Sequence, residues 1–206
     1  MNGLEVLFLS MPVNRKDFAQ VCPVNRKEWR EWLQKNHTQK ESVWLLVAKA
    51  GHAGVTRMEA VEELLCFGWI DSVPNKLNDK YYKLLVSPRK PKSAWSKVNK
   101  TLVAKLIKSG LMQPSGMGMV KLAKKTGTWN ALNAVDQLSY PTDFKNALSK
   151  NKTAQQYFDA FPPSTKKGIL HWIQTARTAE TRTKRIVETV TKAAKNIRAN
   201  QYIKKI

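Results

Sequence analysis

Short apolar runs bounded by turn residues predict strands in the first half of the chain. The continuous run Val43–Ala48, which stops before Gly51, predicts a buried strand. Tyr81–Val86 is rich in aromatic and branched residues and ends before Pro88, so it predicts a second strand. The apolar run Leu4–Leu9 is compatible with a further strand at the start of the chain. We therefore expect a small antiparallel sheet in this half.

Capping residues mark two helix starts in the repeated segment of this half. Pro12–Phe18 recurs as Pro23–Trp29. In each copy an acidic residue follows an asparagine by three positions, and its side chain can accept a hydrogen bond from the backbone N–H of that asparagine, the helix cap. The second copy predicts a helix that carries Trp29, Trp32 and Leu33 on one face.

A capping box formed by Thr56 and Glu59 predicts another helix, which ends near Gly68. Its periodicity places four apolar residues on the inward side: Met58, Val61, Leu64 and Leu65. Cys66 lies within the same apolar segment, so we expect burial to raise its thiol pKa and to leave it unreactive.

The stretch that follows Ser93 predicts a lysine-rich helix. Ser93 can cap a helix that runs to about Ser109 and stops at Gly110. Its apolar side holds Trp95, Val98, Leu102 and Leu106, and its outer side holds Lys97, Lys100, Lys105 and Lys108. We expect a loop over Gln113–Met119 and a short helix through Lys121–Lys125.

The last third of the chain is predicted to be helical. Helices are expected near residues 142–149, 153–160, 164–177 and 179–199, after a boundary at Pro141. The last helix has an apolar stripe of Ile186, Val187, Val190, Ala193, Ala194 and Ile197, with i,i+4 pairs Glu180/Lys184 and Glu188/Lys192 outside it. The predicted fold class is α+β: a domain over residues 1–140 in which the small antiparallel sheet packs with helices, and an all-helical module over residues 141–206.

Charge is distributed unevenly along the chain. It has 36 Lys and Arg against 15 Asp and Glu, a formal net charge of +21. Residues 1–79 hold ten basic and ten acidic side chains, whereas Lys80 to Val135 holds twelve basic side chains and no acid. Such a stretch is either a solvated basic surface or a binding face for an anionic partner: nucleic acid, an acidic protein or an anionic lipid surface. The candidate anion-binding residues are Lys90, Lys92, Lys97, Lys100, Lys105 and Lys108.

Two further features of this acid-free stretch bear on nucleic acid. Lysine outnumbers arginine eleven to one there, which favours diffuse attraction to phosphate over base readout. Tyr81, Tyr82, Trp95 and Trp129 interleave with the lysines and either stack unpaired bases or fill the core.

Composition places the chain among folded soluble proteins. An apolar content of 42% with seven Trp is typical of a globular protein. Cys22 and Cys66 have neither metal-ligand spacing nor a disulfide pattern. No apolar run reaches the roughly 18–20 residues of a membrane span, and Leu4–Leu9 is too short for a signal peptide. We therefore expect a cytoplasmic protein with reduced cysteines and no transmembrane segment.

Three separated segments resemble one known family. They are LCFGWID at Leu65–Asp71, SPRKPKSAWSKVN at Ser87–Asn99 and AETRTKRI at Ala179–Ile186. In this order and spacing they resemble the YdeI/OmpD-associated family, also called bacteriocin-protection proteins, from about Lys27 to Arg198.

This resemblance implies a link to tolerance of cationic antimicrobial peptides and bacteriocins and to an outer-membrane porin, without an established biochemical activity. Because like charges repel, a protein of charge +21 is not expected to sequester cationic peptides. Shielding of an anionic target, or an indirect action, agrees better with the charge.

Asp71 is the carboxylate with the clearest need for a partner. It follows the end of a predicted helix, where the helix dipole disfavours negative charge, so we expect it to contact Arg89 or a neighbouring loop lysine. This contact is either a structural ion pair or part of a small-molecule pocket with aromatic walls and convergent polar groups. The pocket residues would be Trp69, Asp71, Arg89, Trp95, Ser96 and Asn99.

Signals for catalysis are weak. His37, His52 and His171 are predicted to be capping or packing residues, and Glu62 and Glu63 are expected to face different sides of their helix. The sequence contains no P-loop, GxSxG, HExxH or Rossmann fingerprint. We therefore predict no catalytic residue, no cofactor and no metal site, and favour a non-enzymatic protein. The alternatives are sequence-independent nucleic-acid binding through residues 80–135, and a small-molecule binder or enzyme that uses the predicted pocket.

Overall fold

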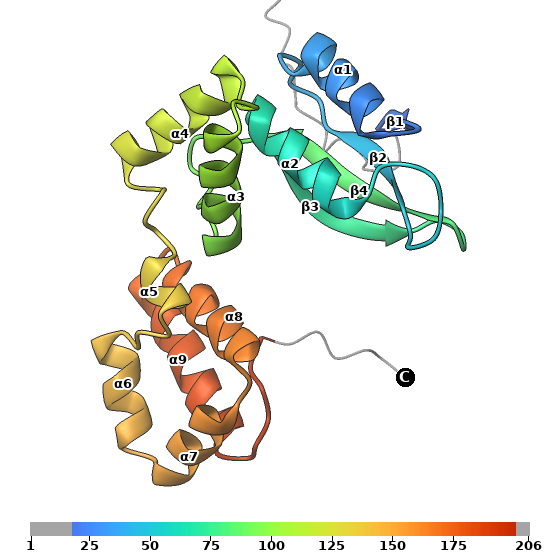
Figure 1. Cartoon of the computed structure of the whole chain (residues 1–206). Helices are drawn as coiled ribbons and strands as arrows, with labels where there is room; N and C mark the ends of the chain where they lie inside the picture. Colours follow the sequence, from blue (N-terminus) through green and yellow to red (C-terminus); the bar gives the residue numbers. More distant parts are fainter. Residues whose placement is uncertain (1–17, 201–206) are drawn as a thin grey trace, which may run out of the picture. The chain divides into compact units, whose positions relative to one another are not determined.

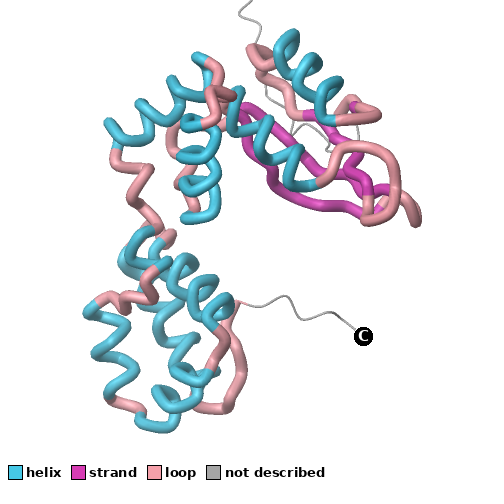
Figure 2. The backbone as a smooth tube through the Cα atoms, viewed as in Figure 1, coloured by secondary structure: helices cyan, strands magenta, loops and turns pink. Residues whose placement is uncertain are grey.

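The computed structural model describes residues 18–200, which form two compact units. Unit 1 contains the described part of Met1–Ser93 together with Val98–Thr126, and unit 2 contains Ala94–Lys97 and the described part of Gly127–Ile206. Strands occur in unit 1, whereas the described part of unit 2 consists of helices and loops (Figure 2). The predicted α+β class with a helical C-terminal region is thus confirmed. The boundary expected at residues 140/141 stays a prediction.

Unit 1 is built on a mixed sheet with the strand order β1-β2-β4-β3. The strands are β1 (Gln20–Val21), β2 (Val43–Ala48), β3 (Trp69–Lys76) and β4 (Tyr81–Pro88). β1 runs parallel to β2, and the β2–β4 and β4–β3 pairs are antiparallel. The predictions for β2 and β4 are confirmed, while the run Leu4–Leu9 lies outside the described residues. β3 was not predicted, because Pro74 and a register shift after Asp71 interrupt its pattern.

Two capped helices, α1 (Arg26–Asn36) and α2 (Arg57–Phe67), lie side by side, and α2 packs on the sheet (Figure 1). The side chain of Asn25 accepts the N–H of Glu28 at 3.0 Å. Thr56 and Glu59 form the predicted capping box, and Gly68 ends α2 with a left-handed φ of 77°. Both helix starts are therefore confirmed, while the start predicted in the first copy of the repeat lies outside the described residues.

The inward faces of these helices were predicted only in part. Trp29 and Leu33 of α1 are fully buried, as expected, and so are Leu64 and Leu65 of α2. The expectation for Met58 was wrong, because its side chain is 57% exposed.

The lysine-rich helix α3 (Lys97–Lys108) begins four residues later than its predicted cap, Ser93. It buries Val103 and Leu106, whereas Val98, which was expected to face inward, is 65% exposed. The buried face of α3 is therefore rotated about the helix axis relative to the face predicted from periodicity.

Helix α4 (Pro114–Thr126) occupies the segment for which a loop was expected, and Gly116 explains the error. A Cβ atom at Gly116 would lie 2.2 Å from the carbonyl oxygen of Cys66, so glycine is needed where α4 crosses the end of α2. The N–H of Gln113 also donates to this oxygen at 3.1 Å. Gly116 therefore suggests a loop in the sequence, but in the structure it allows two helices to approach each other closely.

Unit 2 contains α5 (Asn133–Asp136), α6 (Thr142–Ser149), α7 (Lys152–Ala160), α8 (Pro163–Gln174) and α9 (Ala179–Ala193). The last four were predicted, although α9 ends before residue 199, and α5 was not. The buried side chains that hold them together include Phe144, Phe158, Ile169, Ile173 and Ile186. Of the stripe predicted on the last helix, Ile186 and Ala193 are buried, but Val187 is 58% exposed. None of the helices within residues 18–200 has the length and apolar character of a membrane span.

Candidate functional site

A cluster of five charged side chains joins α1, α2 and α3 in unit 1. Arg26 donates to both carboxylates, through Nη1 to Glu62 and through Nε to Glu63, at 2.7 Å each. Arg30 donates to Glu63 at 2.7 Å, and Lys105 to Glu62 at 3.1 Å. The two carboxylates thus share one guanidinium group, which corrects the expectation that they diverge. Because cations occupy both carboxylates, the cluster lacks the free acid and base that acid–base catalysis requires.

Burial and ion pairing shift the pKa values of this cluster in opposite directions. Burial tends to raise the pKa of Glu62, but the hydrogen bond from Lys105 and the charge of Arg26 outweigh it, so the pKa of Glu62 lies below its usual value. Burial likewise tends to lower the pKa of Arg26, and the two carboxylates reverse this and raise it. The charged state of the cluster is therefore its stable state at neutral pH.

Cys66 lies beside this cluster in the core. Burial and the negative charge of Glu63 raise the pKa of its thiol to about 11, against a weaker opposing effect of Arg30. This confirms the expectation of an inert core cysteine, because the thiolate is the nucleophilic form.

Asp71 lies on β3 and interacts electrostatically with two arginines, Arg57 and Arg89. It forms an ion pair with Arg57, the first residue of α2, at 2.8 Å. Arg89 is buried, which lowers its pKa to about 10, and the charge of Asp71 acts in the opposite direction. The sequence thus indicated the need of Asp71 for a cation but missed Arg57, because β3 was not predicted.

A groove of about 390 Å³ separates α2 from α3 within unit 1. Its lining consists of Arg57, Met58, Val61, Asp71, Val98, Asn99 and Leu102. Two residues of the predicted pocket, Asp71 and Asn99, therefore lie in one groove, together with the apolar residues that were expected to face the core.

The other residues of the predicted pocket have different surroundings. Trp69 is 1% exposed, and its indole N–H donates to the carbonyl oxygen of His37 at 2.9 Å. Trp95 is also 1% exposed and packs on Trp129 of unit 2, with ring centroids 5.1 Å apart. Ser96 is half-buried in the same unit. Both tryptophans therefore serve as core residues of their own units.

The predicted anion-binding lysines also differ from one another. Lys90, Lys92, Lys97 and Lys108 are exposed, and Lys100 is half-buried. Lys105 is the lysine that reaches the buried Glu62. The backbone N–H of Lys97 donates to the carboxylate of Asp136 at 3.2 Å. Two exposed lysines of α4, Lys121 and Lys125, belong to the same acid-free stretch.

In unit 2, polar residues of the segment Ala179–Ile186 take part in capping the ends of two helices. Thr178 accepts the N–H of Thr181 at 3.1 Å and begins α9. Arg182 donates to the carbonyl oxygen of Ile173 and to both oxygens of Asp143, and Arg185 donates to the carbonyl oxygen of Trp172. These arginines thus satisfy the C-terminal carbonyl groups of α8, which is a structural role.

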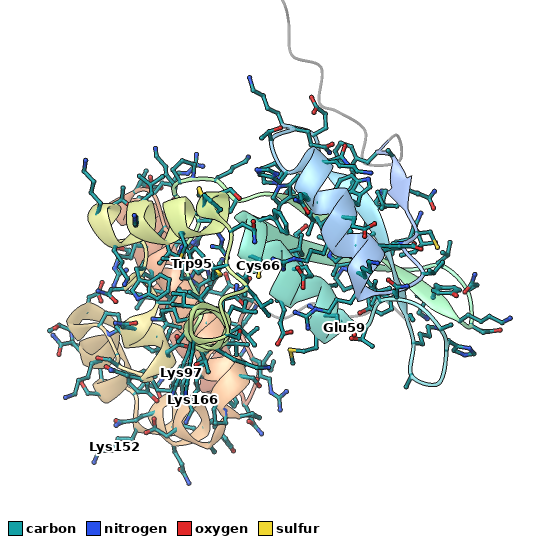
Figure 3. All side chains as sticks on the ribbon, turned by 45° about the horizontal axis from the view of Figure 1, so that its top comes forward. Glu59, Cys66, Trp95, Lys97, Lys152 and Lys166 are labelled. Atoms are coloured by element: carbon teal, nitrogen blue, oxygen red, sulfur yellow. The ribbon has the colours of Figure 1, made fainter. Side chains whose placement is uncertain are left out.

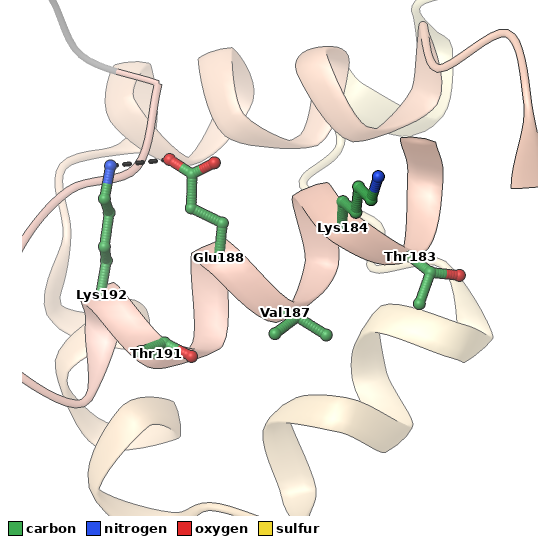
Figure 4. Close-up of a pocket in the computed structure, with 6 residues that line it drawn as sticks. All are labelled: Thr183, Lys184, Val187, Glu188, Thr191 and Lys192. Atoms are coloured by element: carbon green, nitrogen blue, oxygen red, sulfur yellow. Dashed lines mark hydrogen bonds and ion pairs between the residues drawn. The ribbon is translucent and has the colours of Figure 1, made fainter. Parts of the chain in front are cut away.

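The outer face of α9 forms a second concavity around Val187, of about 400 Å³ (Figure 4). Its lining consists of Thr183, Lys184, Val187, Glu188, Thr191 and Lys192, and the ion pair of Glu188 with Lys192 measures 2.6 Å. The pair of Glu180 with Lys184 measures 2.7 Å, so both predicted i,i+4 pairs are confirmed. Every charged group on this face is partnered within the helix, which leaves a neutral surface.

Other candidate chemistry is sparse among residues 18–200. The ring nitrogen Nδ1 of His37 lies 3.1 Å from the carbonyl oxygen of Leu33 at the end of α1, which confirms a capping role. His52 and His171 are exposed. Within this described range, His, Cys, Asp and Glu side chains form no group of three or more that could hold a metal ion.

Comparison with known families divides the chain into two matched regions. Residues 137–196 match the family described as Bacteriocin-protection, YdeI or OmpD-Associated. Residues 21–119 match a different family, described as a Domain of unknown function (DUF8412). The resemblance carried by Ala179–Ile186 is thereby confirmed, and the family match lies in the C-terminal part of the range expected from sequence. Neither the curated proteins nor the solved structures gave a match.

Proposed function

Because residues 137–196 match the family described as Bacteriocin-protection, YdeI or OmpD-Associated, we propose that this protein contributes to tolerance of cationic antimicrobial peptides and bacteriocins as a non-enzymatic, basic, cytoplasmic protein. It acts by binding an anionic partner. Capture of the peptides themselves is disfavoured, since a net charge of +21 repels a cationic peptide. The family description names OmpD, so a porin belongs among the partners to be tested.

A set of exposed lysines in unit 1 carries this proposal. Lys90, Lys92, Lys108, Lys121 and Lys125 are exposed and make no ion pair within residues 18–200. They come from the stretch Lys80 to Val135, which contains no acidic residue, so no neighbour in the sequence neutralises them. Their positive potential therefore remains available to an anionic partner.

A charge-matched pair of variants tests the proposal in cells that lack the protein. The first variant changes Lys108, Lys121 and Lys125 of unit 1 to Gln, and the second changes Lys145, Lys150 and Lys152 of unit 2. Lys152 projects outward from the start of α7 (Figure 3), and all three control lysines are exposed. The minimum inhibitory concentration of a cationic peptide should fall to the level of the deletion strain with the first variant only. Equal protection by both variants would contradict the proposal.

Sequence-independent binding of nucleic acid is the second candidate, and the same lysines favour it. Lysine lacks the planar array of donors that arginine uses to recognise bases, so it attracts phosphates regardless of base sequence. If three to five of these lysines each neutralise one phosphate, the logarithm of affinity for a duplex should fall against the logarithm of salt concentration with a slope of roughly −2.7 to −4.5.

Fluorescence anisotropy measures this directly. Two unrelated duplexes and one single strand should bind with similar affinity at about 50 mM salt and release at about 200 mM. The unit 1 variant should reduce the slope by about 3 relative to wild type, and the unit 2 variant should leave it unchanged. Absence of binding at the lower salt concentration would exclude this candidate while leaving an acidic protein or lipid partner in place.

A further inference from the structure

The groove between α2 and α3 has an apolar floor with an ion pair at one end. Met58 and Val61 of α2 and Val98 and Leu102 of α3 form the floor. Arg57 and Asp71 form the ion pair, and both residues line the groove. Lys105 lies about one turn beyond Leu102 on α3, outside the lining, and binds Glu62, which follows Val61.

Two side chains of the apolar floor are largely exposed to solvent. Met58 is 57% exposed and Val98 is 65% exposed, and both belong to a single groove. Large apolar side chains that gather in one concavity mark a place where an apolar group can bind.

The two ion pairs present their cations outward and their carboxylates inward. The Arg57 side chain is 53% exposed, against 18% for Asp71, and the Lys105 side chain is 70% exposed, against 5% for Glu62. Arg57 binds Asp71 through an N–H of Nη2, and a guanidinium group has five N–H donors in all. A ligand in the groove would therefore meet the exposed cation of Arg57 in the lining, and a ligand that extends past Leu102 would reach the cation of Lys105.

The dimensions of the groove limit the size of its ligand. The α2 residues from Arg57 to Glu62 span about 8 Å and the α3 residues from Val98 to Lys105 about 10 Å, at 1.5 Å per residue. The volume of about 390 Å³ lies at the small end of the range for ligand pockets. An amphipathic helix would need a longer groove, open at its ends, to place its successive apolar anchors.

We propose that this groove binds a short anionic amphiphile, a single alkyl chain of roughly six to eight carbons that ends in a carboxylate. The chain would lie on Met58, Val61, Val98 and Leu102, and the carboxylate would accept hydrogen bonds from Arg57 or Lys105. This site uses none of the five exposed lysines that carry the proposed function and no residue of unit 2, so it is independent of the function proposed above.

Titration of the 15N-labelled full chain with octanoate tests the proposal, with octylammonium as the matched cation. Octanoate should bind with a dissociation constant on the order of 0.1–1 mM, as suits a ligand of few atoms, and should shift amide signals of α2 and α3. Octylammonium should bind at least ten-fold more weakly, and hexanoate, with two fewer methylene groups, roughly ten-fold more weakly. Shifts in unit 2 alone, or equal binding of both ions, would overturn the proposal.

Two matched substitutions locate the site. Val98→Asp places a carboxylate on the groove floor and should weaken octanoate at least ten-fold. Val187→Asp changes a valine of similar exposure on α9 and should leave affinity unchanged. Since both valines are exposed, both variants should fold. Lys105→Gln and Arg57→Gln then identify the end that holds the carboxylate, and unchanged affinity in both variants, or in Val98→Asp, would refute the proposal.

Discussion

Unit 1 and unit 2 differ in how deeply their paired carboxylates are buried. In unit 1, the side chains of Glu62 and Glu63 are 5% and 1% exposed, and cations from α1 and α3 reach them from 33 or more residues away in sequence. In unit 2, the side chain of Asp136 is 20% exposed, and those of Asp143 and Glu180 are 47% and 76% exposed. A buried carboxylate that loses its cation is costly, whereas an exposed one regains water. The stability of unit 1 therefore depends on particular charge contacts to a degree that unit 2 does not share.

Unit 2 contains a cluster of aromatic side chains in its core. Phe144 and Phe158 meet edge to face with centroids 5.1 Å apart, and Tyr140 contacts both rings. Such contacts add to the area that each ring buries and do not change with protonation of nearby acids. The two units thus represent two ways to stabilise a small core in a strongly basic chain.

The largest effect is expected from Glu63→Gln in unit 1. The change leaves Arg26 and Arg30 short of a carboxylate at a nearly buried site, so the free energy of unfolding should fall by about 3 kcal/mol. Chemical denaturation followed by circular dichroism measures it. Glu180→Gln in unit 2 is the control and should change the free energy by less than about 0.5 kcal/mol. Similar losses in both variants would remove the contrast between the units.

The next effect concerns the contact of α4 with α2. Gly116→Ala places a methyl group 2.2 Å from a backbone oxygen, so we expect a loss of about 2 kcal/mol as the helices separate. Gly118→Ala, two residues along the same helix, meets no atom within 4 Å and should be neutral or stabilising by up to about 1 kcal/mol. Thermal unfolding of both variants checks the sign. A Gly116→Ala protein as stable as wild type would mean that α4 does not need this close approach.

Asp143→Asn should have a smaller effect, in unit 2. The carboxylate accepts two hydrogen bonds from Arg182, and because the pair is half-exposed its loss should cost about 1 kcal/mol. Arg182 holds the pKa of Asp143 below its usual value, so this stability is present above the unfolded pKa of about 3.9 and is lost as pH falls through the lower folded value. The difference between wild type and variant should therefore be constant above about pH 5 and should close in acid. A difference that widens in acid would contradict this account.

The smallest effect is expected from Glu188→Gln on α9. Its pair with Lys192 spans one turn of an exposed helix face, so the loss should be about 0.3–0.5 kcal/mol at low salt. Repeating the measurement in 1 M NaCl should abolish the difference by screening. A loss above about 1 kcal/mol would place unit 2 nearer to unit 1 in its dependence on ion pairs.

Much of the fold was predicted from local sequence signals. Asn25 and Thr56 were found as helix caps because the residues that complete each cap follow within three positions. The strand Val43–Ala48 and the helix at residues 142–149 were found because short periodic patterns define them. These are features in which neighbouring residues decide the conformation.

The features that were missed depend on residues far apart in the sequence. Arg26 binds Glu63 across 37 positions, and no local pattern links the two. Gly116 resembles a loop residue until the carbonyl group of Cys66 is placed beside it. Periodicity marked Val98 as apolar but did not distinguish the floor of a groove from a core, because both require the same residue types.

The environment of Cys66 has a practical consequence for labelling. With a pKa of about 11, its thiol is almost entirely protonated at neutral pH and is shielded by the core, whereas Cys22 is exposed. A maleimide dye should therefore react with Cys22 alone in the folded protein and with both thiols once unit 1 unfolds. The number of dyes bound per molecule, read by mass spectrometry, would then report the folded fraction of unit 1 separately from that of unit 2, which contains no cysteine.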